Sequence, residues 1–363
     1  MPSENLDSGT FEQFGRGQIS DFHAIQVLAR RLPKAELHMH FLGSIGRSFP
    51  FPTEDARAAS VGDLVDVADS FDRLRRVARC LTSPTMFEEA TLNILMEHIT
   101  LGCRHVEMFV VPDEIALSPV PVPDALHAIG RAFDQMKRQY GLTGGIIIDI
   151  DRNVGPKMGM AVVELAMSAR DAGVPIPGIG SEGPFEEPVS LVAFAPVNEF
   201  AKKQGFHVTS HLASLQDVID GLELNLERAD HAWDLKGRPE LMAKYREAGI
   251  SITSTPGAVA FHWPGRMPSP FDHPADEFRR NGIKTCIGTD VPAFVQTDIA
   301  QEYVLAQQSY GWTRREMFEI AMNSLEMAWI DGNDRDARLA AWRAEGESLL
   351  EDPRKSNATT LSR

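Results

Sequence analysis

The feature that most constrains the fold is a regular alternation of short strand-like segments with longer helical ones. The clearest strand candidate is 145–151, GIIIDID, which contains three successive isoleucines. A short apolar run of this kind is typical of a strand that is buried on both faces. Seven further segments read as strands: 35–40, 105–111, 176–180, 206–211, 229–233, 250–255 and 284–289.

Helical periodicity fills the intervals between these strands. In 86–101, apolar side chains recur at Phe87, Leu92, Leu95 and Ile99, roughly along one helical face. Glycine follows several of the helical stretches, as expected where a helix ends and the chain turns into a strand. The other predicted helices are 124–140, 158–172, 191–204, 239–248, 274–280, 299–309 and 313–328.

Eight strands alternating with helices predict an α/β fold, a single-domain (β/α)8 TIM barrel. A doubly wound open sheet shows the same alternation and stays the alternative, although no GxGxxG follows the first strand. We expect an N-terminal segment over 1–30 and a barrel over 31–343, with a helical excursion at 44–73 after the first strand. A polar C-terminal tail, 344–363, is expected to fray.

The charge balance limits the class of partner. The chain of 363 residues has 36 Lys and Arg against 51 Asp and Glu, a net charge of −15, which disfavours nucleic acid and anionic membranes. There is no signal-peptide pattern, and no apolar run approaches the ~18 residues of a membrane span. The three cysteines form no CxxC pair. We expect a cytoplasmic protein that acts on a small molecule, with homo-oligomerisation left open.

His38 and His40 lie two residues apart near the end of the first predicted strand. Alternate residues of a strand share one face, so both imidazoles point to the same side, at the barrel mouth where active sites lie. Neighbouring imidazoles repel when protonated, and a divalent metal is a common shared partner. Alone, the pair is a weak signal, and two satisfied or exposed histidines are the more common explanation.

Three further residues favour the metal interpretation. His211 ends the fifth predicted strand, His231 lies in the sixth, and Asp290 follows the eighth. At one rim, such residues would complete a site of three nitrogens and one oxygen that leaves room for water. Taken singly, each of them could instead be a helix cap or a hydrogen-bonded loop residue.

These segments resemble the adenosine deaminase family of the metal-dependent amidohydrolase superfamily. The resemblance rests on LPKAELHMH at 32–40, TSH at 209–211, ADH at 229–231 and GTDVPA at 288–293, in the family's order over roughly 30–330. Because the first motif is specific and the set is ordered, the resemblance covers almost the whole predicted barrel. It implies a hydrolase of C–N bonds with a TIM-barrel fold.

The resemblance also implies a role for each matched residue. Four side chains would hold one divalent metal: His38, His40, His211 and Asp290. His231 would orient and activate the metal-bound water, Asp290 would also accept its proton, and the backbone at Gly183 would approach the heterocycle. Zinc is the first expectation, and Fe(II), Mn(II) and Ni(II) suit the same ligands.

Three departures from the family pattern all remove carboxylates. Leu42 stands where the family has the acid that holds the sugar hydroxyl. Ser214 replaces the glutamate that donates a proton to the ring, and Val291 replaces the acid that binds the far ring nitrogen. Since the metal set is intact and the substrate-reading set is changed, we expect a working metal site whose substrate is not ordinary adenosine.

Glu182 is the candidate replacement for the missing acid, because it precedes Gly183 at the end of the fourth predicted strand. It could instead be a solvated loop carboxylate. The sequence thus predicts that metal-bound hydroxide attacks a C–N centre of a modified purine nucleoside or another small heterocycle. Two alternatives stay open: the same barrel with a different metal-assisted reaction on a specialised metabolite, or a non-catalytic binding protein that retains a metal.

Overall fold

A computed structural model of the chain describes residues 16–46, 49–51, 57, 67–183, 189–330 and 332–351. Within these residues the strands are short and each pairs in parallel with its neighbours. Their bounds are β1 Lys34–Glu36, β2 Cys103–Val110, β3 Thr143–Asp151, β4 Gly178–Glu182, β5 His207–Val208, β6 His211–Leu212, β7 Arg228–His231, β8 Ser251–Ser254 and β9 Thr285–Ile287.

The strands form two sheets, in the orders β1-β2-β3-β4-β5 and β6-β7-β8-β9, that together make one barrel. The fifth predicted strand is interrupted between β5 and β6, where Thr209 N still donates to Ile179 O at 3.1 Å. At the other seam, Asp290 N donates to His38 O and His40 N donates to Asp290 O, both at 2.8 Å. These bonds close the ring, so the predicted TIM barrel is confirmed and the open sheet is excluded.

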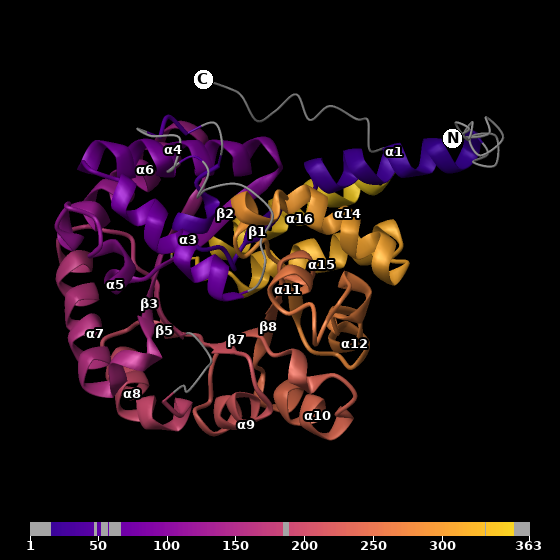
Figure 1. The fold of residues 1–363 in the computed structure, drawn as a ribbon. Coiled ribbons are helices and arrows are strands. Elements are labelled where there is room, and N and C mark those ends of the chain that lie inside the picture. The colour runs from indigo at the N-terminus through magenta and orange to yellow at the C-terminus, as the bar shows by residue number, and fades with distance from the viewer. Residues whose placement is uncertain are drawn as a thin grey trace, which may run out of the picture.

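Helices connect the strands and surround them on the outside (Figure 1). They are α1 Arg16–Arg31, α3 Val67–Cys80, α4 Pro84–Thr100, α5 Pro112–Ile115, α6 Val122–Tyr140, α7 Gly155–Asp171, α8 Ala195–Lys203, α9 Leu215–Glu223, α10 Pro239–Ala248, α11 Pro256–His262, α12 Ala275–Arg280, α13 Pro292–Val295, α14 Ile299–Tyr310, α15 Arg314–Met327 and α16 Arg335–Glu351. Short 3-10 turns are η2 Leu42–Ser44, η3 Arg152–Val154, η4 Leu191–Phe194, η5 Trp233–Leu235 and η6 Pro270–Asp272.

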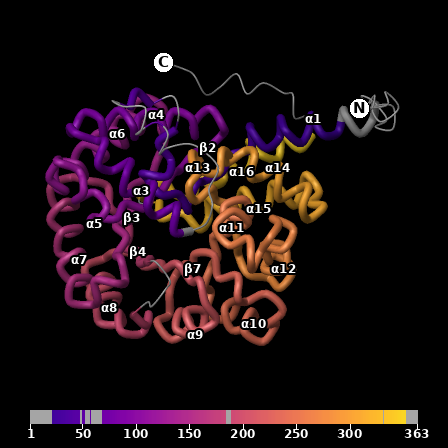
Figure 2. Tube along the Cα trace, viewed as in Figure 1, coloured from indigo at the N-terminus to yellow at the C-terminus, as the bar shows by residue number. Residues whose placement is uncertain are grey.

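The chain runs once around the barrel, so the first and last strands meet (Figure 2). The isoleucine run of β3 is buried on both faces, with Ile146, Ile147 and Ile148 each at 0% exposure. This is the burial expected of a parallel strand covered by helices on one side and by the barrel interior on the other. None of the described helices is both long and apolar enough to span a bilayer.

The chain end differs from its prediction. The boundary expected at 344 falls inside α16, which continues to Glu351. Leu349 is buried, and Arg104 Nη2 donates to Glu345 Oε1 at 2.7 Å. Few apolar residues hold this helix, so its periodicity is weak in the sequence. The rest of the division into 1–30, 31–343 and 344–363 stays a prediction, and 352–363 lie outside the described residues.

The excursion after the first strand returns as α3 over the barrel mouth. α3 contacts η2 after β1, α5 after β2 and α11 after β8, so it bridges connections on different sides of the opening. Phe71 and Leu74 of this helix line the cavity at the mouth. Of the predicted excursion 44–73, only 44–46, 49–51, 57 and 67–73 are among the described residues.

Candidate active site

The barrel mouth gathers the histidines and the aspartate that the sequence singles out. They lie at or just beyond strand ends, and each is at most 7% exposed: His38, His40, His211, His231 and Asp290. Three overlapping groups bring their potential ligand atoms within 4.8 Å of one another. The groups are His38 with His211 and His231, His38 with His40 and Asp290, and His40 with Glu182 and His211.

The donor set fits a divalent cation. His40 Nε2 lies 3.2 Å from His211 Nε2 and 3.6 Å from Asp290 Oδ1. Burial lowers the pKa of His40 to about 4 and lowers the pKa of His211 well below its ordinary value, which favours neutral rings. His38 Nε2 is buried and has no hydrogen-bond partner. Lone pairs that converge without a donor are the arrangement that a metal ion satisfies.

A second layer of contacts fixes the His38 ring. Its Nδ1 lies 2.9 Å from Thr253 Oγ1 and 3.2 Å from Asp230 Oδ1, which leaves Nε2 to face the other ligands. A carboxylate behind a histidine is the usual support of a metal ligand. Burial works against the charged form of Asp230, but the His38 hydrogen bond together with the charges of His38, His211 and Arg228 outweighs it, so the pKa of this carboxyl is lowered. Asp230 directly precedes His231, but no pattern in the sequence predicts this supporting contact.

Backbone strain concentrates at the same place. Asp290 and His231 both adopt a left-handed conformation with φ of 64°, and Ala232 follows with φ of 49°. For residues other than glycine, such conformations cost on the order of 1–3 kcal/mol and are enriched at functional sites. The close backbone bonds between Asp290 and the chain at His38 and His40 hold the aspartate in this position.

Glu182 points into the mouth, as its sequence position predicts. It ends β4, is 5% exposed, and places Oε2 at 3.5 Å from His40 Nδ1. Burial raises its pKa well above the ordinary value, and the nearby carboxylate of Asp149 adds to this shift. Because Glu182 is buried, it is not the solvated loop carboxylate that the sequence left as an alternative. A protonated carboxyl is favoured here, and it can donate a proton.

These side chains line a small cavity of about 40 Å³ at the centre of the mouth. Six residues that the sequence places at strand ends line it: His40, Glu182, His211, His231, Asp290 and Val291. The rest of the lining is Ser70, Phe71 and Leu74 from α3, Trp233 from η5, and His262 and Trp263 at the end of α11. No helix is predicted at α11, so His262 carries no positional signal in the sequence.

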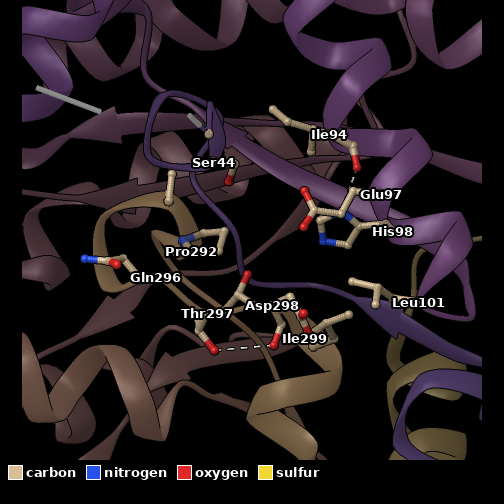
Figure 3. Close-up of a pocket in the computed structure, with 13 residues that line it drawn as sticks. Ser44, Ile94, Glu97, His98, Leu101, Pro292, Gln296, Thr297, Asp298 and Ile299 are labelled. Atoms are coloured by element: carbon tan, nitrogen blue, oxygen red, sulfur yellow. Dashed lines mark hydrogen bonds between the residues drawn. The ribbon is translucent and has the colours of Figure 1, made fainter. Parts of the chain in front are cut away.

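A larger cavity of about 370 Å³ lies on the other side of the β9–α13 connection (Figure 3). Thr289 and Pro292 face it, whereas Asp290 and Val291 face the small cavity, so this short segment is a shared wall. His98 Nδ1 in the larger cavity donates to Ile94 O at 2.8 Å. None of the groups of potential metal ligands found among the described residues lies in it.

The comparisons with known proteins agree with this geometry. The sequence model of a family described as adenosine deaminase matches residues 33–341. The chain belongs to the adenosine deaminase family. The family belongs to the amidohydrolase superfamily, so this chain is a hydrolytic enzyme that acts on C–N bonds. Members of the family use a divalent metal.

Two curated relatives of this family match nearly the whole chain. An adenine deaminase from Cupriavidus necator is 23% identical over 354 residues, which is 93% of this chain and 97% of that protein. An aminodeoxyfutalosine deaminase from Streptomyces coelicolor is 24% identical and covers 86% of each chain. A solved amidohydrolase from Burkholderia ambifaria, with bound zinc, is 25% identical with a TM-score of 0.79, over 92% of this chain and 94% of that one.

The structure locates the residues that depart from the adenosine deaminase pattern and the other predicted substrate-binding residue, Gly183. Only Val291 of the four predicted substrate-binding residues lines the small cavity. Leu42 turns into the core within η2, and Gly183 lines an adjoining cavity. Ser214 is the N-cap of α9, where its Oγ accepts from Asp217 N at 3.1 Å and donates to Asp217 Oδ2 at 2.8 Å. Ser214 occupies the sequence position of the family's acid, but it caps α9 and does not line the cavity.

Proposed function

We propose that this chain is a metal-dependent deaminase for a purine-like heterocycle other than ordinary adenosine. The observation that carries the proposal is the convergence of four buried donor side chains at the barrel mouth, in overlapping groups of three: His38, His40, His211 and Asp290. These residues would hold the metal. Zinc is the first candidate because of the zinc-bound relative, and the ligands also suit Fe(II), Mn(II) and Ni(II).

The metal would supply a water that is activated for attack at neutral pH. His231 turns toward that position because its Nδ1 is held 3.1 Å from Thr255 Oγ1, which leaves Nε2 for the attacking water. The second carboxylate oxygen of Asp290, Oδ2, lies 3.7 Å from His262 Nδ1 and would accept the water's proton. Both residues are buried and adopt left-handed backbone conformations at the mouth.

Glu182 supplies the proton that the heterocycle or the leaving amine requires. The family's position for this acid is held by Ser214, which is committed to capping α9. A general acid contributes about 10²- to 10⁴-fold, so its loss without replacement would leave a poor enzyme. Glu182 is the buried carboxyl of the cavity other than Asp290, and its environment favours the protonated form.

The substrate class follows from the walls and from the relatives. Adenine and aminodeoxyfutalosine, which the relatives' names carry, both contain an amino-substituted purine. Ordinary adenosine would meet Val291 where the family has an acid, and Ser214 offers it no acid because this serine caps α9 outside the cavity lining. Each polar group left unpaired costs about 1–3 kcal/mol. A modified purine, or a comparable planar amino heterocycle, with an apolar side toward Val291 fits the cavity wall better than adenosine does.

The test combines metal analysis with amine release. Purified protein should contain about one divalent metal per chain, and after loading with zinc it should release ammonia or methylamine from a member of a panel. The panel contains adenine, N6-methyladenine, adenosine and small amino-substituted heterocycles. Full metal content without amine release from any member would contradict the deaminase proposal and favour a different metal-assisted reaction.

Glu182→Gln tests the proposed acid within that assay. We expect kcat to fall by about 10²-fold or more, with metal content unchanged, because the amide cannot donate its proton as an acid. Asp113→Asn is the matched control, since Asp113 is an exposed carboxylate of the adjoining cavity. Unchanged turnover of Glu182→Gln across the pH range would remove Glu182 from the mechanism.

A further inference from the structure

Two polar atoms in the walls of the small cavity are buried and have no hydrogen-bond partner. They are Trp233 Nε1 and His262 Nε2, on side chains that are 2% and 8% exposed. An unpaired buried polar group costs about 1–3 kcal/mol. Neither atom belongs to the metal ligands, to His231 or to Glu182. Their partners are therefore expected from a molecule that enters the cavity.

Trp233 can only donate, because the indole N–H has no lone pair to offer. Its ring lies 5.0 Å from the His231 ring and 5.7 Å from the Trp263 ring, measured between centroids. It follows Ala232, whose left-handed backbone fixes the direction in which the chain leaves β7. The indole is therefore held between two aromatic neighbours, with its N–H unpaired beside the proposed reaction centre.

His262 offers the opposite polarity. Its Nδ1 lies 3.7 Å from Asp290 Oδ2, and a carboxylate at this distance favours the tautomer that carries its proton on Nδ1. Nε2 then has a lone pair and accepts a hydrogen bond. α11, which ends at His262, packs against α3, α13 and α14, so the imidazole stands on a supported element.

We propose that Trp233 and His262 read the polar edge of the substrate, in place of the carboxylates that the family uses. This inference rests on the proposed deaminase function. It narrows the substrate to a planar amino heterocycle that offers a ring-nitrogen acceptor to Trp233 Nε1 and an N–H donor to His262 Nε2. Val291, at the same wall, can make neither bond, and Ser214 does not reach the cavity lining.

The experiment removes each hydrogen bond and restores one of them. His262→Phe keeps a flat ring without the acceptor, whereas His262→Gln keeps a carbonyl oxygen that can accept in its place. Trp233→Phe keeps an aromatic wall without the N–H. His273→Asn is the matched control: His273 Nε2 is also buried and unpartnered, but His273 does not line the cavity, and asparagine can still accept from Ala275 N.

Zinc-loaded variants are compared on whichever of adenine, N6-methyladenine or adenosine the wild-type protein turns over fastest. We expect kcat/KM to fall about 10- to 100-fold in His262→Phe and about 10-fold in Trp233→Phe, chiefly through KM. His262→Gln should recover most of the loss, and His273→Asn should match the wild type. Metal content and the unfolding temperature should stay unchanged in all four.

Several results would overturn the inference. His262→Phe within 3-fold of wild type would mean that only water meets Nε2. Loss of zinc from His262→Phe would make His262 a metal ligand, and a glutamine variant no better than phenylalanine would leave only a packing role. In each case the wild type still releases amine, so the proposed function stands. If the wild type releases none from the whole panel, the proposed function fails and this inference fails with it.

Discussion

Two fully buried carboxylates in neighbouring strands have opposite surroundings. Glu107 of β2 accepts hydrogen bonds from His105 Nε2 at 2.9 Å, Trp329 N at 2.7 Å and Arg228 Nη2 at 2.7 Å. Burial alone would raise the pKa of Glu107, but Arg228 and His105 outweigh it and lower that pKa to about 2. This carboxylate is satisfied and ionised.

Asp149 of β3 has no hydrogen-bond partner for either oxygen. Its nearest basic neighbour is His211 Nδ1 at 3.6 Å, and burial raises its pKa well above the ordinary value. The register pairs Glu107 with Gly145, four residues before Asp149 along β3, so Asp149 lies nearer the mouth. Away from the mouth, the buried Glu107 carboxylate is paired with Arg228, which stabilises the fold. At the mouth, buried polar atoms such as those of Asp149 have no hydrogen-bond partner, as expected near a site that binds a metal and a substrate.

The largest effect is expected at the mouth. Asp290→Asn removes a metal ligand and a proton acceptor together, so we expect kcat to fall by about 10²- to 10⁴-fold. Because the mouth contributes little pairing energy, the free energy of unfolding in urea should change by less than about 1 kcal/mol. A loss of stability as large as that expected for Glu107→Gln would mean that Asp290 contributes to folding as well as to the site.

Glu107→Gln should show the reverse. It leaves the buried Arg228 charge without its carboxylate, which typically costs about 3–5 kcal/mol. Urea unfolding followed by circular dichroism measures this loss. The fraction that stays folded should retain wild-type kcat, and a large drop in kcat at full metal content would show that Glu107 acts at the site as well.

The ionised state of Glu107 also makes the stability depend on pH. The folded-state pKa of Glu107 is about 2, below its ordinary value of 4.5, so its contribution is present above pH 4.5 and is lost as the pH falls toward 2. The difference in unfolding free energy between wild type and Glu107→Gln should shrink by about 2 kcal/mol between pH 6 and pH 3. A difference that grows in acid would contradict the assignment.

The smallest effect is expected for Asp149→Asn. The raised pKa of Asp149 favours a neutral carboxyl, which the amide imitates in size and charge. We expect the unfolding free energy to change by less than about 1 kcal/mol. A loss as large as that of Glu107→Gln would mean that Asp149 is ionised and paired, which would remove the contrast between the two carboxylates.

The sequence predicts the barrel and the metal set because both depend on local pattern. Buried strands show as apolar runs, and His38, His40 and Asp290 sit in motifs at strand ends. The walls of the cavity depend instead on tertiary packing: His262 reaches the mouth only because α11 folds against α3. Long-range placement of this kind leaves no periodic signal in the chain.

Ser214 and the C-terminal helix α16 show two other reasons why predictions from the sequence differ from the structure. Ser214 followed three residues later by Asp217 is the pattern of a helix N-cap, and this local signal favours a structural serine over a substrate-binding one. α16 has few buried residues, Gly346 and Leu349 among them, so an amphipathic pattern could not reveal it. The residues that the sequence brings to the mouth, such as His40, His211 and Asp290, are those whose position is set by a strand end.

The most direct test is the anomalous scattering of a crystal of the zinc-loaded protein at the zinc edge. We expect one strong peak per chain at the mouth, within bonding distance of His38, His40, His211 and Asp290. No peak there, or a peak in the larger cavity beside His98 instead, would contradict this expectation.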